Sequence, residues 1–165
     1  MNLPSPSETE RLHAEVDRLR GEMHTYVQSG FTAADAWWVC GWLRDEAISR
    51  DGAIAVDVRR GEQLLAAAAT EGVSADLGAW AERKGRLVRR FALPSLLVGT
   101  RMRARGQGLD HFGLSPAHYA TLGGGCPVTV EGVGVVGSVA ISGLTETEDH
   151  ELVVEALRAL AKRTP

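Results

Sequence analysis

The sequence predicts an α/β domain of the α+β type, with an antiparallel β-sheet flanked by helices on both faces and an added N-terminal helix. Three observations predict it. Apolar residues recur at helical spacing in five segments, and two pairs of alternating segments are joined by short turns. The third is composition: 165 residues, 44% hydrophobic and 24% charged, are typical of one globular domain. Because tight turns join antiparallel strands, the order α-α-β-β-α-α-β-β-α gives a sheet covered by helices.

The first segment, residues 7–28, has a narrow apolar seam. Its apolar residues alternate in spacing between four and three: Leu12, Val16, Leu19, Met23 and Tyr26. A seam this narrow suits packing against one partner helix or a sheet edge. Residues 1–30 are therefore expected to form an N-terminal helical arm, ahead of a single domain at 31–165.

The second helix is expected to run from an N-cap at Thr32, with Asp35 completing a capping box, to about residue 50. Its apolar residues leave almost no polar side: Ala36, Trp37, Trp38, Val39, Cys40 and Trp42. A helix of this kind needs cover on more than one face. Another subunit would supply that cover, or the sheet and the first helix would supply it internally.

Two hairpins follow from alternation and turn residues. In residues 53–59, Ile54, Val56 and Val58 face one side, while Asp57 and Arg59 face the other. A turn at 60–61 leads to an alanine-rich partner strand at 63–69. The second hairpin pairs residues 127–130 with 133–141 around a two-residue Glu-Gly turn.

The remaining helices have recognisable ends. Ser74 is the expected N-cap of a helix to about residue 91, and Pro94 separates it from a helix at 95–105. Residues 106–125 are glycine-rich and predict a loop with a helical turn at 117–122. Thr145 with Glu148 forms a capping box that opens the last helix.

Positive charge is concentrated in one stretch, although the net charge is only -3. No Asp or Glu interrupts the run of Arg83, Lys84, Arg86, Arg89, Arg90, Arg101, Arg103 and Arg105. Lys84 falls within the apolar stripe of its helix, and a buried ammonium needs a partner. Asp57 is one expected partner and an anionic ligand is the other. The stretch is then either a carboxylate or phosphate pocket, or a structural ion pair beside a solvated basic face.

Several classes of protein are disfavoured. No apolar run approaches the ~20 residues of a membrane span, and the first ten residues lack the apolar core of a secretory signal, so a cytoplasmic location is expected. Two cysteines are too few for a disulfide framework. Nucleic-acid binding is not favoured, because recognition signatures are missing and the overall charge is negative. No nucleophile motif identifies an enzyme, and none excludes one.

The histidines show no helical metal-site spacing. His118 and Tyr119 in the loop, and His150 early in the last helix, are the side chains that could approach a haem iron. The glycine run 123–125 precedes a strand, so it predicts backbone turns and not a phosphate loop. Cys126, followed by a proline, is expected to be a buried thiol at the start of a strand.

Several segments carry a family resemblance: 80–84, 88–91, 112–114 with Tyr119, 124–127, 132–137, 139–143, 149–150 and 153–157. They resemble motifs of the haem-degrading domain family, which contains GlcG-like and HbpS-like proteins. Within it, the chain is similar to a short cytosolic branch that is an uncharacterised protein family. The likeness covers roughly residues 31–160.

The resemblance implies a profilin-like fold and homo-oligomers built from dimers. Haem is the ligand that it implies, and it assigns no catalytic residue. Arg83, Lys84, Arg90, Tyr119 and His150 coincide with motifs of the branch. The expected function is a small-molecule-binding module with a cationic pocket formed by those residues with Asp57 and Arg59. The alternatives are an assembly protein that binds partners through its N-terminal helices and an enzyme acting on haem.

Overall fold

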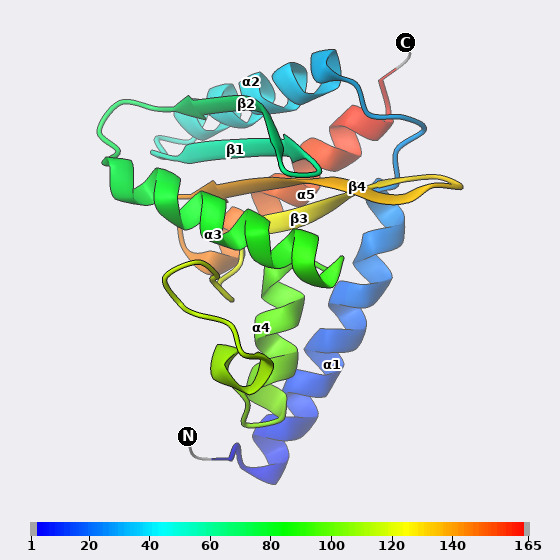
Figure 1. Cartoon of the computed structure of the whole chain (residues 1–165), viewed down its shortest axis with the longest axis vertical. Helices are drawn as coiled ribbons and strands as arrows, with labels where there is room; N and C mark the ends of the chain where they lie inside the picture. The colour runs from blue at the N-terminus through cyan, green and yellow to red at the C-terminus, as the bar shows by residue number, and fades with distance from the viewer. Residues whose placement is uncertain (1–2, 164–165) are drawn as a thin grey trace.

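A four-stranded antiparallel sheet with strand order β2-β1-β4-β3 lies at the centre of the molecule (Figure 1). The computed structural model describes residues 3–163. The elements are α1 (Pro6–Glu22), the 3₁₀ turn η1 (Met23–Tyr26), α2 (Ala33–Ser49), β1 (Ala55–Arg60), β2 (Gln63–Ala69), α3 (Ala75–Phe91), α4 (Ser95–Ala104), the 3₁₀ turn η2 (Leu109–Phe112), β3 (Gly125–Val130), β4 (Gly134–Ser142) and α5 (Glu146–Ala161).

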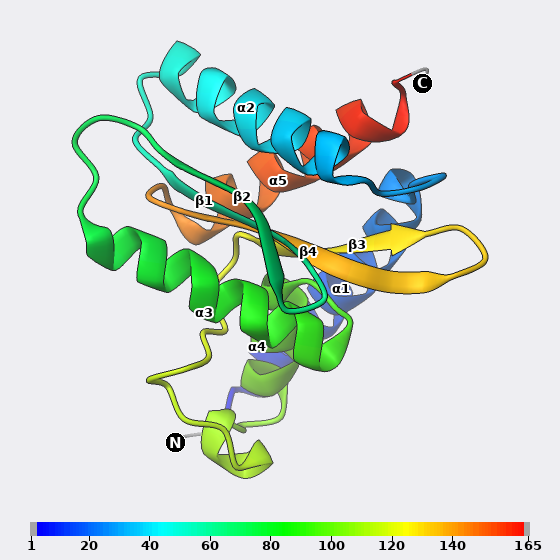
Figure 2. The ribbon, with the colours of Figure 1, turned by 45° about the horizontal axis from the view of Figure 1, so that its top comes forward.

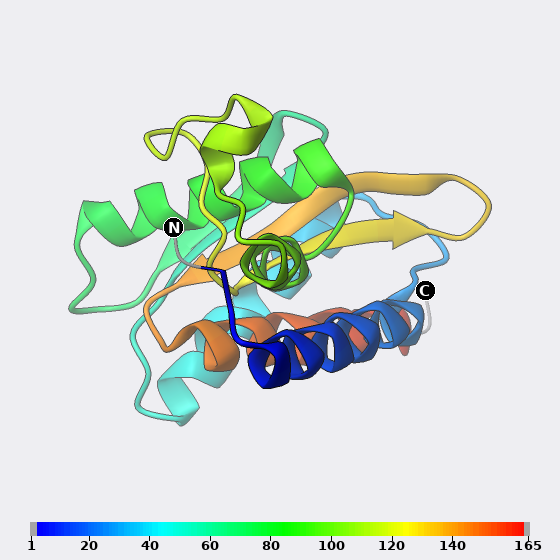
Figure 3. The same ribbon diagram turned by 90° about the horizontal axis from the view of Figure 1, so that it is seen from below.

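Helices cover both faces of the sheet, as the sequence predicts. α3 packs on one face, and α2 and α5 pack on the other (Figures 2 and 3). α1 and α4 lie side by side and project away from the sheet on the side of its β3 edge (Figure 1). In the part of the chain that the structure describes, no helix combines the length and apolar character needed to cross a bilayer.

The two edges of the sheet differ. At β3, the backbone of Gln28 adds a short parallel bridge: its N–H donates to the carbonyl of Thr129 at 2.8 Å, and its carbonyl accepts the N–H of Glu131 at 2.9 Å. β2, at the other edge, pairs only with β1 among the described residues. One edge is therefore capped and the other is open.

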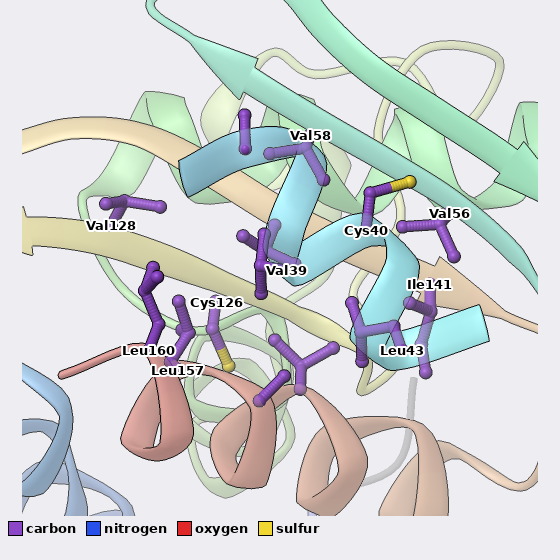
Figure 4. Packing of buried hydrophobic residues seen from close by; sticks show 14 of the residues in the cluster. Val39, Cys40, Leu43, Val56, Val58, Cys126, Val128, Ile141, Leu157 and Leu160 are labelled. Atoms are coloured by element: carbon purple, nitrogen blue, oxygen red, sulfur yellow. The ribbon is translucent and has the colours of Figure 1, made fainter. Parts of the chain in front are cut away.

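The main core lies between the sheet and the layer of α2 and α5. Figure 4 shows side chains of both helices pointing toward the strands, with Val39 and Leu43 from α2 and Leu157 and Leu160 from α5. A smaller cluster joins α1 to α4 and contains Val16, Leu19, Leu96 and Leu97. The narrow seam of the first helix thus packs against one partner helix.

α2 begins with the expected capping box: the Asp35 N–H donates to Thr32 Oγ1 at 3.2 Å, and the Thr32 N–H donates to Asp35 Oδ2 at 2.8 Å. The sheet covers one side of this helix. Trp38 and Trp42 are half-buried, and Trp37 is 60% exposed. Internal packing therefore covers only part of the apolar surface of α2.

Two predicted details are wrong. The first helix ends at Glu22, and the chain tightens there into η1. In the loop, the helical turn is η2 at Leu109–Phe112 and not at residues 117–122. The later residues instead form a turn in which the carbonyl of Ser115 accepts the N–H groups of His118 and Tyr119.

The substitution Gly137→Ala tests the close approach of β4 to β1. A Cβ at this position would collide with the backbone carbonyl of Arg59, which cannot move without breaking the sheet. We expect the free energy of unfolding, measured in urea, to fall by about 1–3 kcal/mol. Gly21→Ala, on the exposed side of α1 where nothing lies within 4 Å, should be neutral or stabilising. Equal unfolding free energies for the two variants would contradict this account.

Candidate functional site

Lys84 is buried where α3 meets the end of β4 and the start of α5. Its Nζ donates to Asp149 Oδ2 at 2.8 Å and to the carbonyl of Ile141 at 3.0 Å, and the two charged side chains are 3% and 2% exposed. The expectation that Lys84 is buried and paired is confirmed. The expected partner is wrong: Asp149 takes the place that the sequence offered to Asp57.

The capping box at Thr145 places Asp149 in the first turn of α5, where its other oxygen accepts the N–H of Leu144 at 3.1 Å. Burial raises the pKa of the Asp149 carboxyl, and the charge of Lys84 opposes that rise without cancelling it. The pair thus consists of an ammonium and a carboxylate that have both lost most of their water.

The glycine run at residues 123–125 allows the backbone to pack closely against this ion pair. A Cβ on Gly123 would collide with the carbonyl of Glu146. Gly124 has a φ of 119°, and a Cβ there would lie 2.9 Å from Lys84 Nζ. The run therefore acts as backbone turns at the entry to β3, as predicted, and it brings the main chain against the ion pair.

The expected acidic and basic residues of the sheet face pair with each other. Arg59 Nε lies 2.9 Å from Asp57 Oδ1 and 3.1 Å from Oδ2, and the Asp57 carboxylate raises the pKa of Arg59. Arg89 bridges Glu62 at 3.0 Å and the Ser138 hydroxyl at 2.8 Å. These arginines are neutralised by carboxylates and do not form an anion pocket with Lys84.

Among the described residues, neither Arg83 nor Arg90 makes a hydrogen bond or ion pair with Lys84 or Asp149. The Arg83 guanidinium stacks 3.9 Å from the ring centre of Trp80 and donates to the carbonyl of Pro116 at 3.3 Å. Arg90 is exposed near the end of α3. The structure therefore does not bring the predicted cations together around one ligand.

His150 belongs to a second buried polar cluster. Its Nε2 lies 2.6 Å from Glu22 Oε2 at the end of α1, and its Nδ1 lies 3.8 Å from Cys126 Sγ in β3. The Tyr26 hydroxyl is buried without a hydrogen-bond partner among the described residues. Burial lowers the pKa of His150, but the Cys126 and Glu22 groups outweigh it and raise the pKa to about 10. Both ring nitrogens face protein groups inside the fold.

The two loop residues have different environments. His118 is exposed, and its carbonyl accepts a hydrogen bond from Arg86 at 3.1 Å. Tyr119 is half-buried against an apolar cluster that includes Val98 and Met102. Of this pair, only Tyr119 therefore packs against the apolar residues of α4.

A pocket that the sequence did not identify lies between α3, α4 and η2. Its volume is about 70 Å³, and its lining combines apolar side chains with cations: Phe91, Val98, Met102 and Phe112 with Arg101, Arg105 and Gln107. The Phe91 and Phe112 rings pack edge to face at 5.4 Å. His111 lies beside it, with Nε2 3.0 Å from Gln107 Nε2.

Arg101 and Arg105 have no carboxylate within ion-pair distance among residues 3–163. Burial lowers the pKa of Arg101, and the positive charges of Arg20 and Arg105 lower it further. We call this group of side chains the arginine pocket. The acid-free stretch from residue 83 to 105 was the sequence signal for it, but only the packing of α4 against η2 shows which cations share the pocket.

Among the described residues, no group of three or more His, Cys, Asp or Glu side chains is arranged to hold a metal ion. A haem iron needs only one or two axial ligands, so this observation does not bear on haem.

The antiparallel sheet with helices on both faces defines an α+β fold. The chain belongs to the HbpS-like family, because the model for "Haem degrading protein HbpS-like" matches residues 31–158. Relatives named UPF0303 protein are 48% identical in Streptomyces avermitilis, over 81% of this chain and 82% of the relative, and 47% identical in Burkholderia thailandensis, over 82% of each.

Solved structures share the fold at lower identity. The Ybr137w protein is similar over 100% of both chains, with a TM-score of 0.84 and 23% identity. HbpS matches with a TM-score of 0.67 and 20% identity, over 82% of this chain and 93% of that one. A PduOC:heme complex matches with a TM-score of 0.68 and 13% identity, over 81% and 96%.

The His150 cluster predicts a pH dependence of stability. In the folded protein the pKa of His150 is about 10, above its usual 6.5. The stability that the charged imidazole of His150 contributes is therefore complete below about pH 6.5 and is lost as the pH rises through 10. We expect the melting temperature to fall between pH 7 and pH 10, and Glu22→Gln to flatten that fall. His24→Gln, which removes an exposed imidazole, is the matched control. Parallel curves for the wild type and Glu22→Gln would contradict the assignment.

Proposed function

We propose that this chain binds a small, largely apolar anion in the arginine pocket, and that haem is this ligand. The observation that carries the proposal is the pair Arg101 and Arg105, which line an apolar pocket and have no carboxylate partner among the described residues. Arg101 is half-buried and Arg105 is exposed, so both charges are free to pair with a ligand carboxylate at the mouth of the pocket.

The chemistry of the lining suits haem. The guanidinium groups of the two arginines can each form a pair of hydrogen bonds with a haem propionate. The rings of Phe91 and Phe112 supply apolar contact for a face of the porphyrin. Met102, which lines the pocket, and His111 and Tyr119 beside it carry the donor atoms that bind haem iron. His150 is not among them, because its two nitrogens face Glu22 and Cys126.

A haem is far larger than the 70 Å³ of the arginine pocket, so binding requires the η2 segment to move outward. Gly106 and Gly113, on either side of η2, have φ values of 60° and 68°. Glycines at these positions allow the backbone to turn with little steric cost. We therefore expect haem binding to be accompanied by a displacement of residues 106–113.

Membership of the HbpS-like family supports haem as the ligand, and a haem complex among the structures of similar fold agrees with it. Neither identifies a site in this chain, because the haem complex is only 13% identical. The position of the site rests on the lining of the arginine pocket.

The proposal is tested by an anaerobic titration of the full chain with haem, followed by the Soret band. We expect a saturable shift at one haem per chain. Arg101→Ala with Arg105→Ala should weaken binding at least about tenfold, because each charged hydrogen bond contributes ~1.5–3 kcal/mol. Arg44→Ala, which removes an exposed arginine paired with the adjacent Asp45, is the matched control.

The same titration with Met102→Leu, His111→Ala, His118→Ala and Tyr119→Phe identifies the iron ligand. Loss of the Soret shift in one of these variants, with the fold intact by circular dichroism, names it. A featureless, non-saturating response of the wild type would overturn haem as the ligand. Saturable haem binding with the same affinity in the wild type and in the double arginine variant would overturn the arginine pocket as the site.

We also propose that the chain forms a homodimer through the outer side of α2. Trp37 is 60% exposed and lines a hollow of about 350 Å³ together with Trp38, Gly41, Trp42, Asp45 and Glu46. Exposed tryptophan is costly in water and is enriched at protein interfaces. A second copy fits by symmetry, because each indole would fill the hollow of the other copy.

Trp37→Asp tests the dimer. The side chain is exposed, so the variant should fold, while the charge should shift the mass measured by light scattering from dimer to monomer. Val133→Asp changes an equally apolar side chain, 72% exposed in the β3–β4 turn, and should leave the mass unchanged. A wild-type chain that is monomeric at all concentrations would rule the interface out.

A further inference from the structure

Lysine is scarce in this chain, and its placement is unusual. Only Lys84 and Lys162 occur among its 18 basic residues. Lys162 is exposed, whereas Lys84 is 2% exposed. The two residue types differ in chemistry, because a lysine amine can lose its proton and become a nucleophile while a guanidinium stays charged.

Lys84 has an unused donor that lies beside a cavity. An ammonium carries three N–H groups, and two of them are taken by Asp149 Oδ2 and the Ile141 carbonyl. No other acceptor among the described residues receives the third. Lys84 and Asp149 line a cavity of about 190 Å³, and apolar side chains of Leu77, Trp80 and Leu122 line it as well.

The charges around this cavity favour a neutral ligand. Lys84 is opposed by Asp149 and by Glu146, whose Oε2 also accepts the Gly123 N–H at 3.3 Å. The nearby guanidinium of Arg83 stacks on Trp80. The carboxylates thus offset the cations, and an anion would gain little here. This distinguishes the cavity from the arginine pocket, with which it shares no lining residue.

We propose that Lys84 is a reactive amine that forms an imine with a small apolar aldehyde bound in this cavity. The carbonyl oxygen accepts the free N–H of Lys84, and the apolar part lies against Trp80 and Leu77. The site holds the amine, an acid and the carbonyl together, which is the arrangement that Schiff-base chemistry needs.

Asp149 supplies the proton transfers. The Lys84 ammonium gives a proton to the Asp149 carboxylate, 2.8 Å away, and burial favours the neutral acid. The amine lone pair then forms the C–N bond, the carbonyl π pair moves to oxygen, and a proton from nitrogen reaches that oxygen. Asp149 protonates the resulting hydroxyl, which leaves as water. The products are a protonated imine paired with the Asp149 carboxylate and one water, so no oxidant or reductant is consumed.

Reductive trapping tests the proposal with benzaldehyde as the probe. The folded full chain is incubated with benzaldehyde and borohydride near pH 7, and the benzyl label on each lysine is quantified by peptide mass spectrometry. We expect Lys84 to be labelled at least about tenfold faster than the exposed Lys162. In urea, where the cavity is lost, the two lysines should be labelled at the same rate. Labelling of Lys84 that is no faster than that of Lys162 in the folded chain would overturn the proposal.

Two variants separate the cavity from the ion pair. Leu122→Trp fills the cavity from an exposed loop position and leaves Lys84 and Asp149 unchanged. It should abolish the preferential labelling of Lys84, and labelling at the wild-type rate would overturn the cavity as the binding site. Asp149→Asn should slow labelling of Lys84 and leave Lys162 unaffected. If that variant fails to fold, the comparison of the two lysines in the wild type and in Leu122→Trp still decides the question.

Discussion

The ion pair between Lys84 and Asp149 joins the two sides of the molecule. Lys84 comes from α3 on one face of the sheet, Asp149 comes from α5 on the other, and the Ile141 carbonyl of β4 lies between them. Neither charge would be tolerated alone at 3% exposure or less. The pair therefore fixes how the helical layers sit relative to each other, because any displacement that separates the charges leaves both without water.

The cluster around His150 fixes the N-terminal helix in a similar way. Glu22 at the end of α1 reaches the imidazole of α5, and Tyr26 from η1 is buried in the main core. Burial, together with the neighbouring Cys126, raises the pKa of the Tyr26 phenol, which therefore stays neutral. Two buried polar contacts thus hold α5 to elements far from it in sequence, and apolar packing fills the space between them.

Local signals in the sequence predicted most of the fold. The hairpin partner at Gln63–Ala69 and the capping boxes at Thr32 and Thr145 depend on residues a few positions apart, and all are present. The partner of Lys84 could not be read in this way, because Asp149 lies 65 residues away and no local spacing links the two. The arginine pocket depends on how α4 and η2 meet across a loop, so its cations were visible in the sequence but their convergence was not.

The capped edge at β3 has a consequence for how this protein associates. Gln28 occupies the hydrogen-bonding positions of β3, and β2 remains the one open edge among the described residues. A sheet that is open at both edges can add chains without limit and grow into a fibre, whereas a sheet open at one edge is saturated after a single addition. Edge-to-edge association of this chain is therefore expected to stop at two copies, because the short segment around Gln28 blocks the β3 edge.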